Sequence, residues 1–346
     1  MENIGIDVHK KESQLCIIAE NGEVIERRIR TDRARFGEVL GKRARARILV
    51  EASTESEWVA RCLEELGHEV IVADPSYAPM YATRSRRVKT DRRDARTLAD
   101  ALMTGAYRLA HRTSDRQRHI RMRLRTREQM VRTRAKFVCA IQSIIRGQGW
   151  RIDSGSTRHF LARLVRLPLT DEVKLAIEPM AELLQSLNEK IDKADGELTS
   201  LAREDALTKR LCTAPGVSTI VALTFVAAVD DVRRFRNAHN LQAYFGLVPS
   251  EHSSGEKQRK GRITKAGNPT MRRLLVQSTL SLVRSRRADA RWLQDWTRAI
   301  AVRRGAQIAR VALARKLAGV LYAMMRDESS FRAPPSRALP RERQAA

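Results

Sequence analysis

The chain has 346 residues, and its 66 Lys and Arg outnumber its 40 Asp and Glu, which gives a formal net charge of +26. This length allows two or three domains with a substantial core. The charge favours a polyanionic partner over the alternative of a merely soluble basic protein. Only 5% of the residues are aromatic, so surfaces that stack single-stranded bases are not the dominant theme.

The four cysteines are scattered and form no CxxC pair, which argues against a zinc site or a disulfide framework. The N-terminus has no basic stretch followed by an apolar one, so we expect no signal peptide. The longest nearly apolar run, 217–229, is too short to cross a bilayer. We therefore expect a cytoplasmic protein associated with the nucleoid.

The first 75 residues alternate between strand and helix patterns. Ile4, Ile6 and Val8 alternate as in a strand, with Asp7 on the opposite face. Asn21-Gly22 is typical of a hairpin turn. Further strands are expected over 13–19, 24–29, 47–51 and 70–73, and helices over 34–41 and 57–66. This order predicts an α/β domain with a mixed sheet.

Four acids stand out against this framework. Asp7 and Glu51 end two of the strands, where open α/β sheets build their sites. Asp91 and Asp94 lie three residues apart in a helix predicted over 91–103, so they face the same way. Taken alone, each acid has an ordinary explanation. Asp7 would be a solvated strand residue, Glu51 an acid at a helix N-terminus, and Asp91 and Asp94 part of an ordinary helix face. Converging carboxylates repel unless a cation lies between them, so together they indicate one metal site.

Cations crowd four stretches: the approach to Asp91, a basic helix predicted over 114–145, the segment 257–265 and the start of a helix predicted over 270–284. A charge run is usually a solvated face, but a run of one sign repels itself unless a polyanion neutralises it. The side chains expected to contact nucleic acid are Arg84, Arg86, Arg87, Lys89, Arg92, Arg93, Arg116, Arg121, Arg123, Arg125, Lys257, Arg259, Lys260, Arg262, Lys265, Arg272 and Arg273.

A heptad pattern runs from Met180 to Leu201, and Pro179 suits the first turn of such a helix. The pattern predicts a coiled coil with another helix, either within the chain or from a second subunit. Ser218 is a candidate cap for a helix through Val229. One or two more helices are expected over 291–325.

Ser253-Ser254-Gly255 lies in a stretch of small residues followed by cations. Such a sequence is more often just a loop. A hydroxyl also needs an activating base or metal before it attacks phosphorus, and the following Lys and Arg residues suit a phosphoryl transition state.

Taken together, these motifs resemble those of the DEDD-type insertion-sequence transposases, also described as bridge-RNA-guided recombinases. The resemblance covers nearly the whole chain except its tail. The matching motifs are Gly5-Ile6-Asp7, Val50-Glu51-Ala52, Lys89-Thr90-Asp91-Arg92-Arg93-Asp94-Ala95, Pro215-Gly216-Val217, Phe245-Gly246-Leu247-Val248-Pro249, Ser254-Gly255 and Thr264-Lys265-Ala266-Gly267. Ser253 beside Ser254 is a departure, and the position directly before the Gly is the one that matches.

The resemblance implies that Asp7, Glu51, Asp91 and Asp94 bind Mg²⁺, with one or two ions, and that Ser254 forms a covalent phosphoserine link to DNA. It implies donor and target double-stranded DNA as substrates, and a structured noncoding RNA that pairs with both. It also implies a homodimer that assembles into a tetramer. Our hypothesis is that the acids and Ser254 form one composite site.

The implied domains are an RNase H-like (RuvC-like) α/β domain over 1–150 that ends in the basic helix, a linker and coiled-coil segment over 151–206, a mainly helical transposase domain over 207–330, and a disordered tail over 331–346. Two other readings of the residues stay open. A metal-dependent nuclease such as a junction resolvase, with water as nucleophile, would need only the four acids. A non-catalytic nucleic-acid-binding scaffold would need only the cations.

Overall fold

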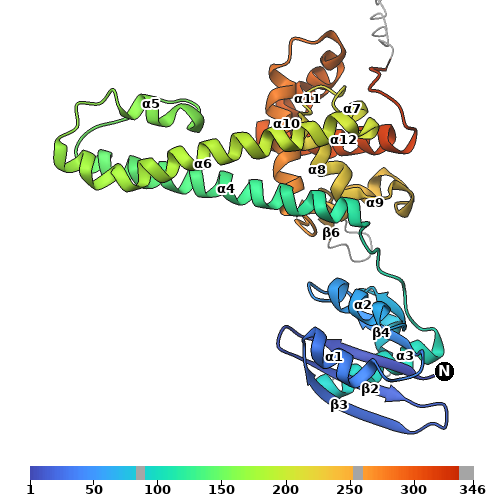
Figure 1. The fold of residues 1–346 in the computed structure, drawn as a ribbon. Coiled ribbons are helices and arrows are strands. Elements are labelled where there is room, and N and C mark those ends of the chain that lie inside the picture. Colours follow the sequence, from blue (N-terminus) through green and yellow to red (C-terminus); the bar gives the residue numbers. More distant parts are fainter. Residues whose placement is uncertain (83–89, 252–259, 335–346) are drawn as a thin grey trace, which may run out of the picture. The chain divides into compact units, whose positions relative to one another are not determined.

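The computed structural model describes residues 1–82, 90–251 and 260–334 and divides the chain into two compact units, Met1–Arg112 and Thr113–Ala346 (Figure 1). The division falls inside the range 1–150 that we predicted as one domain. The reason is that the basic helix packs against helices of the second unit. Among the described helices, none combines the length and apolar composition that crossing a membrane requires.

Unit 1 is built on the predicted mixed sheet, with strand order β3-β2-β1-β4-β5. Strands β1, β2 and β3 pair in antiparallel fashion, and β1, β4 and β5 pair in parallel. The strands are β1 (Asn3–Val8), β2 (Glu12–Ile18), β3 (Val24–Arg30), β4 (Arg47–Glu51) and β5 (Glu69–Ala73). All five predicted strands are confirmed to within about one residue at each end.

Helices cover both faces of this sheet. On one face, α1 (Arg33–Leu40) and α2 (Ser56–Glu65) pack on alternate strand residues such as Ile4 and Ile48. On the other face, α3 (Asp91–Thr104) packs on residues of the opposite parity, such as Cys16 and Leu49. A short 3₁₀ turn, η1 (Ala78–Tyr81), precedes α3. The period-2 alternation of strand side chains thus sorts each strand into two cores.

Unit 2 begins with two long helices, α4 (Asp115–Gly147) and α6 (Asp171–Glu204), which lie side by side (Figure 1). Between them lie η2 (Thr157–His159) and α5 (Phe160–Leu164). The heptad positions Leu184, Ile191 and Leu198 are buried, and Leu184 and Leu198 share core clusters with α4 of the same chain. The helical pairing is therefore made within the chain, which was one of the two alternatives. A coiled coil with a second subunit stays a prediction.

Helix α6 begins at Asp171, so the prediction that it starts near Pro179 is wrong. Val173 and Ile177 are buried in the same cluster as Ile141 and Ile145 of α4. Packing of these side chains extends the helix by two turns and carries it through the proline.

Replacing Pro179 by Ala is expected to stabilise unit 2. Pro179 is exposed and lies inside α6, where a proline lacks the N–H that would bond one turn back. Removing a helix-interior proline gains about 1–3 kcal/mol, provided that the helix does not need a kink there. Thermal unfolding should show a higher midpoint for the variant. Glu178→Ala, at the exposed neighbouring position, should change the free energy of unfolding by less than about 0.5 kcal/mol.

The remainder of unit 2 is helical and surrounds α8 (Thr219–Val229), every residue of which from Val221 to Val229 is buried. Ser218 caps α8 as predicted, because its side chain accepts a hydrogen bond from the Val221 amide. The other elements are α7 (Ala206–Leu211), η3 (Val232–Arg234), α9 (Ala238–Tyr244), α10 (Pro269–Arg284), η4 (Ala288–Ala290), α11 (Arg291–Arg304) and α12 (Ala306–Arg326).

A two-stranded antiparallel sheet is an addition to the predicted elements of unit 2. Strands β6 (Pro249–Glu251) and β7 (Lys260–Ile263) lie on either side of the serine motif, in a stretch that we read as a loop. Both strands are short, with the sequences Pro-Ser-Glu and Lys-Gly-Arg-Ile, so they lack the alternating apolar pattern that identifies a strand in a sequence.

Candidate metal and nucleic-acid site

Asp7 and Glu51 lie at the same edge of the sheet. Strands β1 and β4 run parallel with Ile6 opposite Val50, and each acid is one residue further along its strand. Asp7 has the same parity as Gly5, and Glu51 the same parity as Leu49, so both acids belong to the face that α3 covers. Strand register alone therefore brings these two acids together.

Helix α3 brings the other two acids to this edge. An added Cβ on Gly5 would overlap backbone atoms of Ala95 and Ala99, so α3 lies directly on β1 at this glycine. The Thr90 side chain caps the helix by accepting a hydrogen bond from the Arg93 amide, and Asp91 and Asp94 occupy its first turn. The positive end of the helix dipole favours carboxylates there.

The other three acids act on Asp7. The pKa of Asp7 is raised above its usual value, first because burial removes water from the carboxylate. His9 opposes this shift, while the carboxylates of Asp94, Asp91 and Glu51 raise the pKa of Asp7 further. All four predicted acids therefore share one electrostatic neighbourhood. A cation bound there would relieve the repulsion.

Two residues that the sequence analysis did not single out also join this edge. Nε2 of His9 lies 3.2 Å from Oδ2 of Asp7 and 3.5 Å from Oδ1 of Asp91. The Tyr81 hydroxyl donates a hydrogen bond of 2.8 Å to Oε2 of Glu51. The spacing of Asp7 and His9, two residues apart at the end of an alternating strand pattern, was a signal that could have identified His9. No pattern in the sequence pointed to Tyr81.

Possible ligand atoms of Asp7, His9 and Asp91 all lie within 4.8 Å of one another. Carboxylate oxygens are the ligands that hard divalent cations prefer, and imidazole nitrogen suits transition metals. The side chains are accessible to a ligand, because Asp91 is 49% exposed and His9 is 54% exposed. These three residues form a group that could hold a divalent metal, and among the described residues Glu51 and Asp94 are not part of it.

The Lys and Arg residues of unit 1 that we predicted to contact nucleic acid fall into three groups. Arg92 forms an ion pair with Glu26 of β3, which ties the first turn of α3 to the sheet. Arg93 is exposed beside the acids. Four others, Arg84, Arg86, Arg87 and Lys89, lie outside the described residues.

On α4, the predicted cations have different surroundings. Arg116 pairs with Asp205 at 3.0 Å. The guanidinium of Arg121 donates to the carbonyls of Ala227 and Ala228 at the end of α8, and burial lowers its pKa. Arg123 and Arg125 are exposed. Arg121 thus stabilises the C-terminus of α8, which gives it a structural function whether or not it also contacts nucleic acid.

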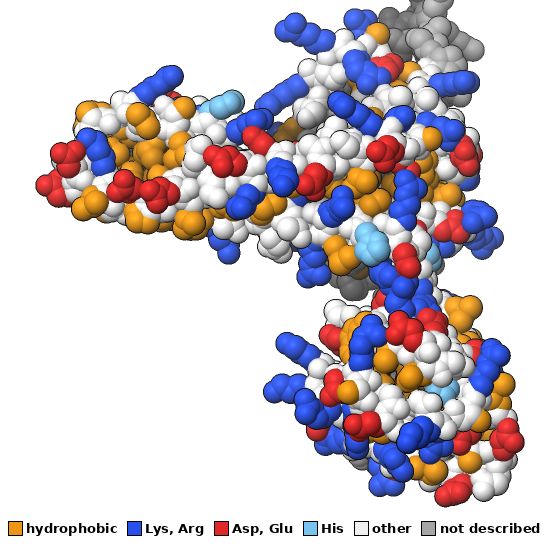
Figure 2. All heavy atoms as spheres, viewed as in Figure 1, with side chains coloured by type: hydrophobic (Ala, Val, Ile, Leu, Met, Phe, Trp, Pro, Cys, Tyr) orange, Lys and Arg blue, Asp and Glu red, His pale blue; other side chains and the backbone are white. Residues whose placement is uncertain are grey.

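A groove of about 440 Å³ lies between α4, α8 and the N-terminus of α10. Arg121, Arg125, Arg127 and Arg132 line it together with Glu128. Figure 2 shows Lys and Arg side chains over much of this view of unit 2, with acids interspersed along α4 and α6. Arg127 pairs with Asp195 and Arg132 with Glu128, so part of this positive charge is neutralised within the chain.

The motifs around residues 245 and 265 meet in the structure. An added Cβ on Gly246 would overlap the backbone of Ala266, and one on Gly267 would overlap the carbonyl of Tyr244, so the two loops are in direct contact. Arg272 fixes them by donating to the carbonyls of Phe245, Ala266 and Gly267, at 3.0, 2.6 and 3.2 Å. This arrangement holds the base of the β6–β7 hairpin.

The remaining residues that we predicted for catalysis or nucleic-acid binding lie between 254 and 273 in the sequence. Arg262 and Lys265 are exposed, and Arg273 donates to the buried Glu128 at 2.6 Å. Lys260 belongs to β7. Ser254, Lys257 and Arg259 lie outside the described residues.

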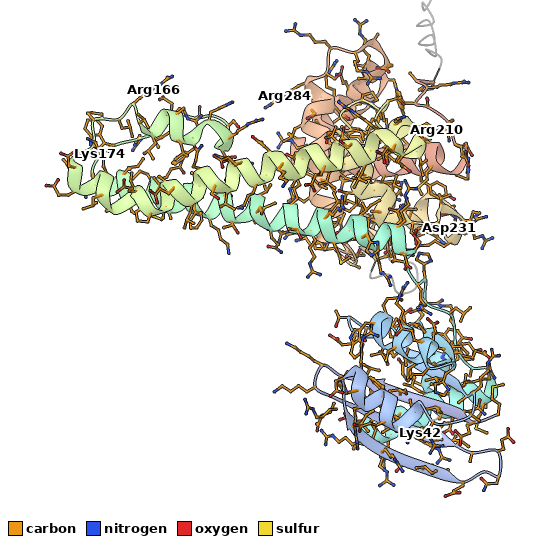
Figure 3. The ribbon with its side chains drawn as sticks, viewed as in Figure 1. Lys42, Arg166, Lys174, Arg210, Asp231 and Arg284 are labelled. Carbon is orange, nitrogen blue, oxygen red and sulfur yellow. The ribbon has the colours of Figure 1, made fainter. Side chains whose placement is uncertain are left out.

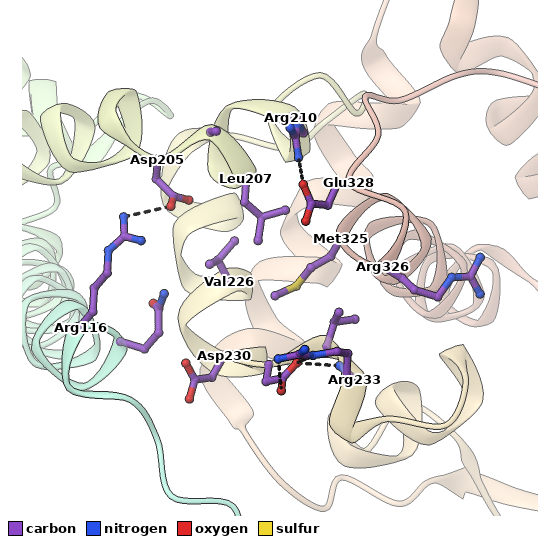
Figure 4. Close-up of a pocket in the computed structure, with 14 residues that line it drawn as sticks. Arg116, Asp205, Leu207, Arg210, Val226, Asp230, Arg233, Met325, Arg326 and Glu328 are labelled. Carbon is purple, nitrogen blue, oxygen red and sulfur yellow. Dashed lines mark hydrogen bonds and ion pairs between the residues drawn. The ribbon is translucent and has the colours of Figure 1, made fainter.

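A cavity of about 650 Å³ lies in unit 2 between α4, α7, α8 and α12, and none of the four acids is among its lining residues (Figure 4). Opposite charges on its walls pair with one another, as in Arg116 with Asp205 and Arg210 with Glu328. Figure 3 shows Arg210 and Asp231 in this part of unit 2, whereas Arg166 and Lys174 project near the far end of α4 and α6. The mixed charge of the walls selects neither anions nor cations.

Comparison with known proteins agrees with the resemblance that the sequence motifs indicated. A family model named for DEDD transposases of IS110 elements, described as "Transposase", matches residues 4–148. A second, described as "Transposase IS116/IS110/IS902 family", matches residues 208–294.

Individual relatives cover most of the chain. The transposase for insertion sequence element IS1111A of Coxiella burnetii is 28% identical over 95% of this chain and 91% of its own length. A probable family 20 transposase of Pseudomonas aeruginosa is 28% identical over 96% and 99%. The putative transposase y4pF/y4sB of Sinorhizobium fredii is 31% identical over 82% and 74%. With both family models matched in order, the chain belongs to the IS110/IS116 family of insertion-sequence transposases.

Proposed function

We propose that this transposase cuts and rejoins DNA with a Mg²⁺-binding tetrad, Asp7, Glu51, Asp91 and Asp94, and with Ser254 as the attacking group. A structured noncoding RNA that pairs with donor and target DNA would select the sites. The proposal is supported by the position of Asp7 and Glu51 at one edge of the sheet and by the effect of the Asp94, Asp91 and Glu51 carboxylates on the pKa of Asp7. An RNase H-like fold, in which acids gather at this edge, fits the strand order β3-β2-β1-β4-β5.

The residues at this edge fit Mg²⁺, because the four acids offer oxygen donors and repel one another without a cation. When bound, the ion would polarise a phosphate oxygen and stabilise the charge of phosphoryl transfer. The chain's own residues prepare the site. Tyr81 orients Glu51 through its hydrogen bond, and the Thr90 cap fixes the start of α3. The missing Cβ of Gly5 lets the backbone of α3 lie directly on β1 at Ala95.

In the proposed step, Oγ of Ser254 loses its proton and bonds to phosphorus. One P–O ester bond of the DNA breaks at the same time, and the departing oxygen takes up a proton. Rejoining is the same exchange in reverse with a new DNA hydroxyl, so the bond energy is kept and no ATP is needed. Strands β6 and β7, held at their base by Arg272, would carry the serine motif.

Exposed cations support the proposed nucleic-acid partners, and exposed apolar residues support the proposed oligomer. Exposed cations such as Arg93, Arg123 and Arg125 suit backbone contacts, which are all that a protein needs when RNA reads the sequence. Apolar side chains gather near the end where α4 finishes and α6 begins. Val165 is 84% exposed there, and Leu175 is 71% exposed (Figure 2). A patch of this kind favours assembly, and exchange between two duplexes suits a dimer that forms a tetramer.

Trapping a covalent DNA end tests the proposal. Full-length protein with its copurified RNA, Mg²⁺ and a labelled donor end should give an adduct that survives denaturation. Ser254→Ala should abolish the adduct, with strand cutting reduced by roughly 10³-fold or more. Ser253→Ala is the matched control and should retain both.

Cutting at full rate by Ser254→Ala would overturn the serine mechanism and favour the water-using nuclease. If only Ser253→Ala loses the adduct, the nucleophile is Ser253 and not Ser254. An adduct that forms equally well after removal of the RNA would refute guidance at this step.

A further inference from the structure

His9 is the one nitrogen donor among the described residues that lie at the acid edge of unit 1 within reach of two of the acids. Its imidazole extends from the end of β1 between Asp7, on the same strand, and Asp91, on α3. His9 directly follows the last residue of β1, and its ring nitrogen lies within 3.2 Å of the Asp7 carboxylate. A strand and a helix therefore present three donors to one point.

The distances between these donors suit a shared cation. Nε2 of His9 is 3.2 Å from Oδ2 of Asp7 and 3.5 Å from Oδ1 of Asp91. Two neighbouring ligands of an octahedral ion, each about 2.1 Å from it, lie about 3.0 Å apart, and wider angles bring them to about 3.5 Å. Both His9 distances thus match the separations between neighbouring ligands of a single first-row divalent ion, and ligand atoms of all three residues lie within 4.8 Å of one another.

An ordinary structural role explains His9 less well. A histidine that serves the core is buried and fixed by backbone partners, as His68 is between the Ala46 amide and the Leu40 carbonyl. His9 is instead 54% exposed, and its ring nitrogen faces carboxylates that are already crowded. An exposed ion pair of this kind contributes little to stability.

We propose that His9 is a metal ligand of the acidic site and that it shifts the site's preference from Mg²⁺ toward Mn²⁺ and similar transition ions. This inference rests on the proposed metal-binding function of the acids. Imidazole nitrogen is a good ligand for transition metals, whereas Mg²⁺ strongly prefers oxygen. The four acids would bind either ion, and His9 would add affinity for the softer one.

Pulsed EPR of full-length protein loaded with Mn²⁺ tests the inference directly. The wild-type protein should show a ¹⁴N coupling from a directly bound imidazole, and His9→Ala should lose it. In titrations at one fixed pH, His9→Ala should weaken Mn²⁺ binding about tenfold or more and change Mg²⁺ binding by less than about threefold. His119→Ala, an exposed histidine of α4, is the matched control and should change neither.

The two proposals fail in different ways. If Mn²⁺ binds the wild-type protein without a ¹⁴N coupling, or if His9→Ala keeps the Mn²⁺ affinity, His9 is no ligand, while the acid site stands. If neither ion binds, and Asp7→Asn makes no difference, the metal site itself is refuted. Circular dichroism of His9→Ala should match the wild type, because the side chain is exposed.

Discussion

Replacing Asp7 by Asn is expected to abolish strand cutting and, at the same time, to make the metal-free protein more stable. Loss of one carboxylate from a site that organises phosphoryl transfer should lower the rate by roughly 10³-fold or more. The ionised form of Asp7 is unfavourable in the folded chain, because burial and the carboxylates of Asp94, Asp91 and Glu51 raise its pKa. The neutral amide removes that cost.

The pH dependence follows from the same shift. The folded state holds the Asp7 proton more tightly than the unfolded state, so the contribution of Asp7 to stability is greatest below the unfolded pKa. It decreases as the pH rises through the raised folded pKa, and at neutral pH the ionised group destabilises the fold. Without metal, the stability advantage of Asp7→Asn should therefore be larger at neutral pH than at pH values below 4.

Unfolding followed with and without Mg²⁺ provides the measurement. The wild-type protein should gain about 2.7 kcal/mol when Mg²⁺ is present at 100 times its Kd, and Asp7→Asn should gain much less. Glu23→Gln, an exposed acid of unit 1, is the control and should behave like the wild type. Full activity in Asp7→Asn would support the non-catalytic scaffold instead.

Replacing Gly5 by Ala is expected to have the largest effect on stability. An added Cβ would overlap the carbonyl oxygen of Ala95 and the amide nitrogen of Ala99, and both are backbone atoms of α3 that no rotamer change can move. The helix would have to shift from the sheet, with a loss of about 3 kcal/mol in the free energy of unfolding. Asp91 and Asp94 would move with it, so cutting should also fall.

Gly37 supplies a matched control within the same unit. It lies inside α1 with nothing within 4 Å of an added Cβ, so Gly37→Ala should raise stability by about 0.5–1 kcal/mol. Denaturant unfolding and hydrogen exchange of unit 1 measure the stability of the Gly5→Ala and Gly37→Ala variants. Equal effects of the two substitutions would contradict the close approach of α3 to β1.

The part of the fold that depends on local pattern was predictable. Alternating apolar residues gave the five strands, and the position of Asp7 and Glu51 at strand ends indicated that they would meet. The close approach of α3 to Gly5 could not be predicted, because it depends on two backbones that are distant in sequence. The start of α6 was misplaced for a related reason, since Val173 and Ile177 acquire their partners only when α4 lies beside them.

Arginine roles were the least predictable. Arg121 and Arg272 look in the sequence like their neighbours Arg123 and Arg273, yet both donate to backbone carbonyls of distant elements. Composition identifies a basic surface. An arginine that stabilises a helix end and an arginine that binds phosphate can, however, occur in the same sequence pattern. Only the tertiary contacts distinguish them.

The burial of α8 bears on how unit 2 can be divided. One side of this helix packs on the C-terminal helices, and its other side, through Leu223 and Ala227, packs on Ile120 and Leu124 of α4 and on Leu198 of α6. A fragment that starts at residue 207 would expose that second apolar side to water and is expected to aggregate. The family match over 208–294 therefore covers only part of compact unit 2, whose long helices α4 and α6 cover the second apolar side of α8.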